Sequence, residues 1–224
     1  MNQRNYQKEL EKTIQTVISE KEAGSVQRPP RLFLHSCCAP CSSYVLEYLC
    51  PYLAITVFYY NPNISVSEEY RKRVEEQKRL IACYNKEQKG YPIQIVEGDY
   101  RPEEFFQMAK GYETCQEGGE RCFRCFEMRL RETAVQALKG GYDYFATTLT
   151  ISPLKNAVKI NEIGESLAEE LGIAWLPSDF KKKNGYKRSI ELSTEYELYR
   201  QDYCGCAFSK AERANRYHNK EELS

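Results

Sequence analysis

The feature that most constrains this chain is the grouping of its cysteines. Seven of the ten cysteines lie in three short clusters that are far apart in the sequence. The clusters are Cys37-Cys38-Ala-Pro-Cys41, Cys122-Phe-Arg-Cys125 and Cys204-Gly-Cys206. Two neighbouring side chains on one backbone cannot easily bind the same tetrahedral ion, and seven thiols exceed the about four that a structural zinc ion binds. We therefore expect an iron–sulfur cluster with thiolates left for a second metal. The pattern therefore predicts a metal centre.

The compartment decides how these cysteines are interpreted. Residues 1–22 alternate charges instead of forming the apolar run of a signal peptide, and no segment reaches the roughly 18 apolar residues needed to cross a bilayer. We therefore expect a cytoplasmic protein, in which thiols stay free or bind metal. Lys plus Arg equals Asp plus Glu at 32 each, so any contact with nucleic acid has to come from a local patch.

Two other interpretations of the cysteines stay open at this point. A CxxC pair combined with two further cysteines would make a structural zinc site. A CxxC motif also occurs in thioredoxin-like redox sites, but that interpretation leaves the other two clusters without a role. Mixed Cys/His sites have little to draw on, because His35 and His218 are the only histidines.

The hydrophobic pattern alternates between strand-like and helix-like segments. We expect strands at 31–35, 54–60, 93–96, 142–149 and 173–176, and helices at 42–50, 67–86, 122–139 and 156–171. Helices between buried strands predict an α/β fold with a doubly wound, mostly parallel sheet that is covered on both faces. Ligands bind such sheets at the carboxyl ends of the strands. The first cysteine cluster directly follows the 31–35 strand, so we expect the metal site at that edge.

The other two cysteine clusters carry local signals of their own. Cys122 and Cys125 lie one turn apart at the start of the expected helix, where amide groups and the helix dipole favour thiolate. Gly205 separates Cys204 from Cys206, and its missing side chain allows a sharp turn and a close approach of the backbone to a cluster. We expect all four thiols to be metal ligands.

A basic segment supplies the local patch that an RNA contact would need. Residues 181–188 hold five cations in eight positions. Cations can follow phosphates, and aromatic rings can stack on bases splayed from a loop. The candidate RNA-binding residues are Lys181, Lys182, Lys183, Tyr186, Lys187 and Arg188. A solvated surface loop is the alternative interpretation.

Five motifs together resemble a known family. In order they are HSCCAPCSS, FYYNPNI, GGERCFRCFEMRL, ATTLTISPLKN and KRSIELSTEYELYRQDYCGCAFS, and they span about 31–209. Their order and spacing resemble the cobalamin-independent (QueH-type) epoxyqueuosine reductases of queuosine biosynthesis. The resemblance implies a fold related to the adenine nucleotide α-hydrolases (HUP fold) and a [4Fe–4S] cluster with a nearby non-haem iron. It also implies reduction of epoxyqueuosine to queuosine in the anticodon loop of tRNA, with an external electron donor.

The same resemblance implies which residues form the metal site. Its ligand candidates are Cys37, Cys38, Cys122, Cys125, Cys204 and Cys206, without a division between the cluster and the lone iron. Some family members have an acidic residue where this chain has Cys41, and we expect Cys41 to bind the second metal here. Candidates for the proton donor are His35, Asp202 and Tyr203, which lie beside cysteines in the sequence and each also have an ordinary structural interpretation.

Two other functions remain open from the sequence. A tRNA-thiolating enzyme can combine the same sheet with a cluster, but it would need an SGGxDS-type loop for ATP where HSCCAPC stands. A zinc-stabilised RNA-binding module would bind tRNA and lack iron. For the chain as a whole we expect a charged extension over 1–28, one catalytic α/β domain over 29–212 and a polar tail over 213–224.

Overall fold

The centre of the fold is a sheet of five parallel strands. The computed structural model describes residues 4–221, with side chains up to residue 215. The strands are β1 (Arg31–His35), β2 (Ala54–Tyr59), β3 (Gln94–Glu97), β4 (Tyr144–Thr147) and β5 (Ala174–Trp175). Their order is β3-β2-β1-β4-β5, and every neighbouring pair runs parallel. The expected α/β fold with a parallel sheet is thus confirmed.

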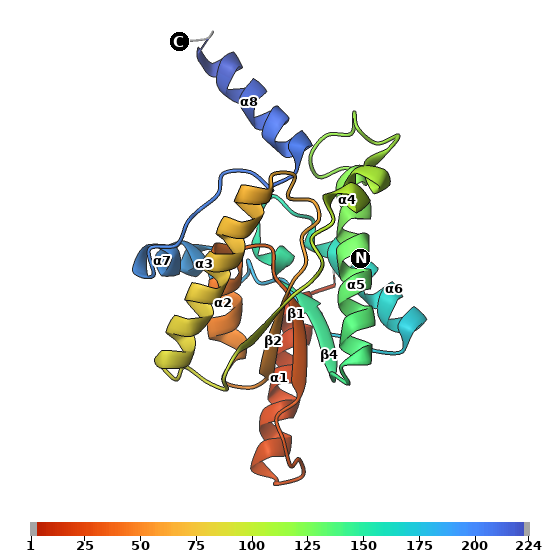
Figure 1. The fold of residues 1–224 in the computed structure, drawn as a ribbon. Coiled ribbons are helices and arrows are strands. Elements are labelled where there is room, and N and C mark those ends of the chain that lie inside the picture. The colour runs from red at the N-terminus through yellow and green to blue at the C-terminus, as the bar shows by residue number, and fades with distance from the viewer. Residues whose placement is uncertain (1–3, 222–224) are drawn as a thin grey trace.

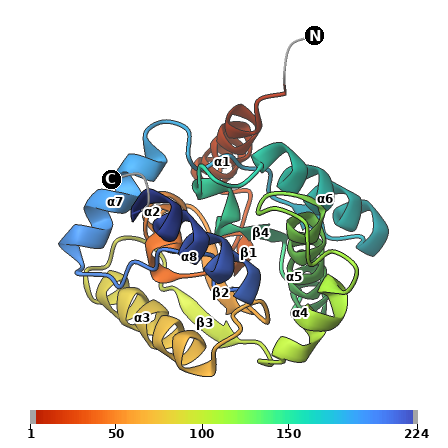
Figure 2. The same ribbon diagram turned by 90° about the horizontal axis from the view of Figure 1, so that it is seen from above.

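Helices cover both faces of this sheet. They are α1 (Tyr6–Glu22), α2 (Ala39–Leu49), α3 (Ser67–Lys86), α4 (Pro102–Ala109), α5 (Glu120–Lys139), α6 (Ala157–Leu171), α7 (Gly185–Glu195) and α8 (Ala207–Glu221). Figure 2 shows α2, α3 and α7 on one side of the strands and α5 and α6 on the other. The strand order changes direction between β1 and β4, which makes the carboxyl ends of these two strands the usual place for a ligand in such a sheet.

The central strands have the composition that burial on both faces requires. Leu32, Phe33 and Leu34 of β1 are all buried and pair in register with β2 on one side and β4 on the other. The strand β4 is shorter than expected and ends at Thr147. The Thr147 hydroxyl accepts a hydrogen bond from the amide of Leu149, and the chain continues as the 3₁₀ turn η1 (Thr148–Ile151).

Four helices were not expected from the sequence: α1, α4, α7 and α8. Helix α1 lies within the segment expected to be a charged extension, and Leu10, Ile14 and Val17 on one of its faces pack into the main core. Helix α7 contains half of the basic segment that was expected to contact RNA. Helix α8 extends away from the body (Figure 1) and takes up most of the expected polar tail. Residues 222–224 of that tail, residues 1–3 and the side chain of His218 lie outside the described part.

Candidate metal centre

Cys37, Cys38 and Cys41 form a compact group at the carboxyl end of β1, which we call the thiol trio. Their Sγ atoms all lie within 4.8 Å of one another, and those of Cys37 and Cys38 are 3.8 Å apart. Thiolates about 2.3 Å from one tetrahedral metal ion would lie about 3.8 Å apart. The trio therefore has the spacing that a single metal ion requires.

Local backbone geometry produces this trio. Cys38 precedes α2 with an extended backbone, and its Sγ still lies close to that of Cys37. The expectation that two neighbouring side chains cannot easily bind the same ion is therefore wrong for this pair. The helix begins at Ala39, three residues earlier than expected, and this places Cys41 in its first turn. From the neighbouring strand end, Thr148 places its hydroxyl 3.9 Å from the Cys37 sulfur. The trio thus lies at the sheet edge where the sequence predicted the first cluster.

The remaining clustered cysteines line one small internal cavity, and we call them the thiol quartet. Its members are Cys122, Cys125, Cys204 and Cys206. The first two lie in the first turns of α5, and the last two lie in the loop that leads into α8. The cavity measures about 20 Å³, and Phe105 and Phe126 line it together with polar residues such as Arg121. Tertiary structure therefore joins two cysteine pairs that are far apart in the sequence.

Gly205 allows the third cysteine cluster to reach this cavity. Its φ is +112°, a backbone conformation that residues other than glycine rarely adopt. A Cβ atom at this position would lie 2.9 Å from the Ile64 side chain. The Gly205 carbonyl accepts a hydrogen bond from the Ser65 amide, while Arg73 donates to the carbonyl of Cys204. The sharp turn expected at Gly205 is confirmed.

A cleft of about 590 Å³ connects the two thiol groups with the surface. Cys37 and Cys41 of the trio line this cleft, and so does Cys204 of the quartet. Cys204 also lines the inner cavity, so it belongs to the walls of both spaces. The volume lies within the range of roughly 300–1,000 Å³ that small-molecule sites occupy. Both thiol groups are therefore accessible from one cleft of ligand size.

Comparison with known proteins assigns the family. The family model described as epoxyqueuosine reductase QueH matches residues 32–212. The chain belongs to the epoxyqueuosine reductase QueH family. It is 44% identical over 201 residues to the Staphylococcus epidermidis epoxyqueuosine reductase QueH, covering 89% of this chain and 83% of that protein. The Streptococcus pyogenes protein of the same name is 43% identical, covering 89% and 77%, and the Thermotoga maritima protein is 35% identical, covering 83% and 93%.

Membership of the QueH family makes this chain an oxidoreductase, as the sequence motifs indicated. This membership argues against the two alternative functions, a tRNA-thiolating enzyme and an RNA-binding module without catalysis. None of the ten cysteines of this QueH family member, all of which lie within the described residues, forms a disulfide bond. Within residues 4–221, no helix combines the length and the apolar composition needed to span a membrane.

The thiols of this QueH family member interact strongly with one another. Hydrogen bonds from Cys38 and Cys41 lower the pKa of Cys37 well below its usual range, and the same bonds raise the pKa values of the two donors. In the quartet, burial raises the pKa of Cys125 to about 11 and that of Cys206 to about 12. Metal binding therefore has to displace protons from most of these thiols.

Three cations that were not among the predicted site residues lie beside the thiols. Arg129 and Lys155 fall within two of the five motifs, which would have been a signal, whereas Arg73 lies outside all of them. Arg73 and Arg129 are almost fully buried, and Lys155 is half-buried on the wall of the cleft. Burial alone lowers the pKa of Lys155, but the charges of Cys37 and Cys204 raise it overall. The positive charges favour thiolate at both groups, as metal binding requires.

The three candidates for the proton donor lie in different surroundings. His35 is fully buried, with Nδ1 2.8 Å from the Thr147 hydroxyl and Nε2 3.2 Å from the Tyr60 carbonyl. Burial, with a smaller contribution from Arg129, lowers its pKa to about 3, so the ring is neutral. Asp202 and Tyr203, by contrast, line the cleft.

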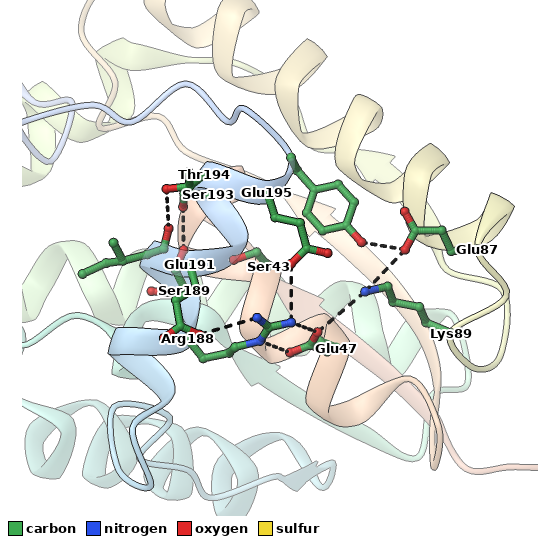
Figure 3. Close-up of polar contacts among 12 residues, drawn as sticks. Ser43, Glu47, Glu87, Lys89, Arg188, Ser189, Glu191, Ser193, Thr194 and Glu195 are labelled. Carbon is green, nitrogen blue, oxygen red and sulfur yellow. Dashed lines mark hydrogen bonds and ion pairs between the residues drawn. The ribbon is translucent and has the colours of Figure 1, made fainter.

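The structure divides the basic segment into paired and unpaired cations. Arg188 forms a two-pronged ion pair with Glu47 of α2, at 3.0 and 2.8 Å, and Figure 3 shows this pair inside a larger network of charges. Lys181 pairs with Asp179, and Lys183 pairs with Glu11 of α1.

The other members of the basic segment face solvent. Lys182 and Lys187 are exposed and have no ion-pair partner among the side chains that the structure describes. Tyr186 is also exposed and lines the cleft. Of this segment, Tyr186 therefore reaches the cleft that leads to the thiols, and the two unpaired lysines are exposed on the same segment.

Proposed function

We propose that this chain reduces epoxyqueuosine to queuosine in the anticodon loop of tRNA, the last step of queuosine biosynthesis. The family and the names of its relatives support this reaction. The observation that carries the proposal is that two separate thiol groups open onto one cleft of about 590 Å³. A modified nucleoside splayed from an RNA loop fits a cleft of this size.

We further propose a division of the cysteines between two metal sites. The quartet, Cys122, Cys125, Cys204 and Cys206, surrounds one cavity and offers the thiolates that a [4Fe–4S] cluster takes. The trio, Cys37, Cys38 and Cys41, has the close sulfur spacing of a single-ion site and would hold the non-haem iron. The cysteines of the quartet and the trio thus fit the cluster and the iron, respectively. The strand order β3-β2-β1-β4-β5 supports the proposed relation of the fold to the adenine nucleotide α-hydrolases.

The side chains around the cleft suggest how the substrate is handled. When bound, the cluster and the iron would supply electrons one at a time and a Lewis acid for the epoxide oxygen, with electrons drawn from an external donor. Asp202 and Tyr203 line the cleft, so they are our candidates for delivering a proton. Both ring nitrogens of His35 already have partners, which better suits a role in joining the ends of β1 and β4.

We propose that the basic segment 181–188 contacts the tRNA, and that its residues differ in how readily they can do so. Lys182, Tyr186 and Lys187 are exposed, and Tyr186 lines the cleft, so these three are the strongest candidates for RNA contacts. Lys181, Lys183 and Arg188 already have carboxylate partners, and an RNA phosphate would have to compete for them. We place this reaction in the cytoplasm, where tRNA and reduced thiols occur together.

The proposed reaction is tested by metal content followed by turnover. Protein purified without oxygen should contain about five iron and about four acid-labile sulfide per chain, and little zinc. The loaded protein, with a chemical reductant, should convert epoxyqueuosine to queuosine in tRNA, as measured by mass spectrometry of the digested nucleosides. Zinc without sulfide that persists after cluster reconstitution, or loaded protein that leaves epoxyqueuosine unchanged, would contradict the proposal.

The RNA contact is tested separately with two matched double variants. We expect Lys182→Ala with Lys187→Ala to weaken tRNA binding and to reduce the salt dependence by roughly 0.7 in slope per lysine. Lys181→Ala with Lys183→Ala removes the same charge from paired positions and should have the smaller effect. Iron content serves as the control for both variants. Equal tRNA affinity of the first variant and the unmodified protein would rule out this surface.

A further inference from the structure

Arg129 of α5 is a buried charge with an incomplete set of partners. Its side chain is fully buried. The Nε atom donates to the carbonyl of Cys125 at 3.3 Å, and Nη1 donates to the Asn61 side-chain oxygen at 3.2 Å. The Nη2 atom has no hydrogen-bond partner. Buried polar atoms without a partner are rare, and they commonly mark a place where a bound group completes the bonding.

The other two deeply buried arginines show what Arg129 lacks. Arg73 forms an ion pair with Glu69 at 2.7 Å, and Arg121 forms one with Glu212 at 3.1 Å. Among the residues that the structure describes, no carboxylate pairs with Arg129. A buried charge without a counter-charge is strongly unfavourable, because the protein interior solvates it poorly. Some other negative group must therefore balance Arg129 in the working protein.

The negative groups that act on Arg129 are the metal-binding thiolates. Cys125, Cys204 and Cys122 of the quartet and Cys37 of the trio all stabilise its charge against the effect of burial. Arg129 also lies on the same helix as Cys125, one turn further along, and bonds to the backbone of that cysteine. Of the three deeply buried arginines in the described part of the chain, the one without a carboxylate is thus the one on which cysteines of both thiol groups act.

We propose that Arg129 is a positioning residue for the iron–sulfur centre, which it holds by balancing the negative charge and by offering its unpartnered Nη2 group as a hydrogen-bond donor. This inference rests on the proposed function. A fixed positive charge stabilises the more negative, reduced form of a cluster over its oxidised form. Net charge and hydrogen bonds to the sulfur atoms are known determinants of cluster potentials. Arg129 therefore raises the reduction potential of the centre.

Two variants and one control separate this role from simple packing. Arg129→Met keeps much of the side-chain volume and removes the charge and the donors. Arg129→Lys keeps the charge but has a shorter reach and a different donor geometry. Arg131→Gln removes one charge from the exposed side of the same helix, where Arg131 pairs with Glu127 and Glu170.

The first readout is the reduction potential of the cluster, measured by titration followed by electron paramagnetic resonance. We expect Arg129→Met to shift the potential to more negative values, Arg129→Lys to restore part of the shift, and Arg131→Gln to leave it unchanged. If the Arg129→Met protein keeps its cluster, the reduction potential is the measurement that tests the proposal. A potential equal to that of the unmodified protein would overturn the proposal.

The second readout is thermal unfolding of the metal-free protein, which decides where Arg129→Met cannot keep a cluster. The metal-free variant should then melt at the same or a higher temperature than the metal-free parent, because an unbalanced buried charge has been removed. A variant that fails to fold, or melts lower, without metal would show an ordinary structural role and overturn the proposal. Unmodified protein that binds no iron and sulfide would instead contradict the proposed function.

Discussion

The thiol trio and the thiol quartet differ in how the chain builds them. The trio comes from five consecutive positions, and its geometry follows from the end of β1 and the first turn of α2. The quartet joins the start of α5 to a loop before α8, and long-range contacts such as Arg73 to the Cys204 carbonyl hold it together. A local site needs only its own segment, whereas the quartet depends on the packing of the whole carboxyl edge.

The two groups also differ in access. Cys37 and Cys41 open onto the large cleft, while the quartet surrounds a small cavity that Phe105 and Phe126 also line. Cys204 is the exception, because it lines both spaces. This arrangement suits a substrate that meets the trio directly and a cluster that stays shielded from solvent. Three sets of variants test the division, beginning with the largest expected effect.

Cys125→Ser should remove the cluster and leave most of the trio intact. We expect a loss of about four iron and nearly all sulfide per chain, because Cys125 is a buried member of the quartet. Cys38→Ser, the matched change in the trio, should lose about one iron and keep its sulfide. Iron and acid-labile sulfide assays on protein purified without oxygen measure both. Equal losses in the two variants would show that the groups form a single site.

Cys41→Ser should lower the iron content by about one per chain without changing the sulfide content, because Cys41 completes the trio. Cys41→Asp should keep that iron, since a carboxylate can also bind it. Cys83→Ser is the control, because Cys83 is an isolated cysteine on α3. An unchanged ratio of iron to protein in the Cys41→Ser variant would contradict the assignment of Cys41 as a metal ligand.

Gly205→Ala should affect the quartet and spare the trio. Its positive φ costs roughly 1–2 kcal/mol with any side chain, and the new Cβ would also meet Ile64. Gly172→Ala is the matched control, because Gly172 also has a positive φ, +73°, but no atom within 4 Å of an added Cβ. Urea unfolding should show the larger loss for Gly205→Ala, together with reduced sulfide content. Equal destabilisation and full sulfide in both would mean that the turn does not position the quartet.

Much of the framework followed from the sequence because it is local. The bounds of β1 and α3 agree with the expected ranges, and α6 ends at Leu171 as expected, with Gly172 after it in the left-handed conformation. Helix α7 was missed because it directly follows residues 181–184, a lysine-rich stretch with the composition of a solvated loop. Arg188 of this helix pairs with Glu47, which is distant in the sequence, and no local pattern reveals that contact.

The sequence by itself determined which thiols are available, how closely they follow one another, and that the first group follows a buried strand. Backbone geometry fixes such features over a few residues, so the place of the first cluster was predictable, but the convergence of Cys37 and Cys38 was not. Only the tertiary structure decided that Cys122 and Cys125 share a cavity with Cys204 and Cys206, and that Arg129, bonded to the Cys125 carbonyl, has no carboxylate partner among the described residues. Those facts depend on packing between distant elements, where many weak contacts act together and no single segment carries the information.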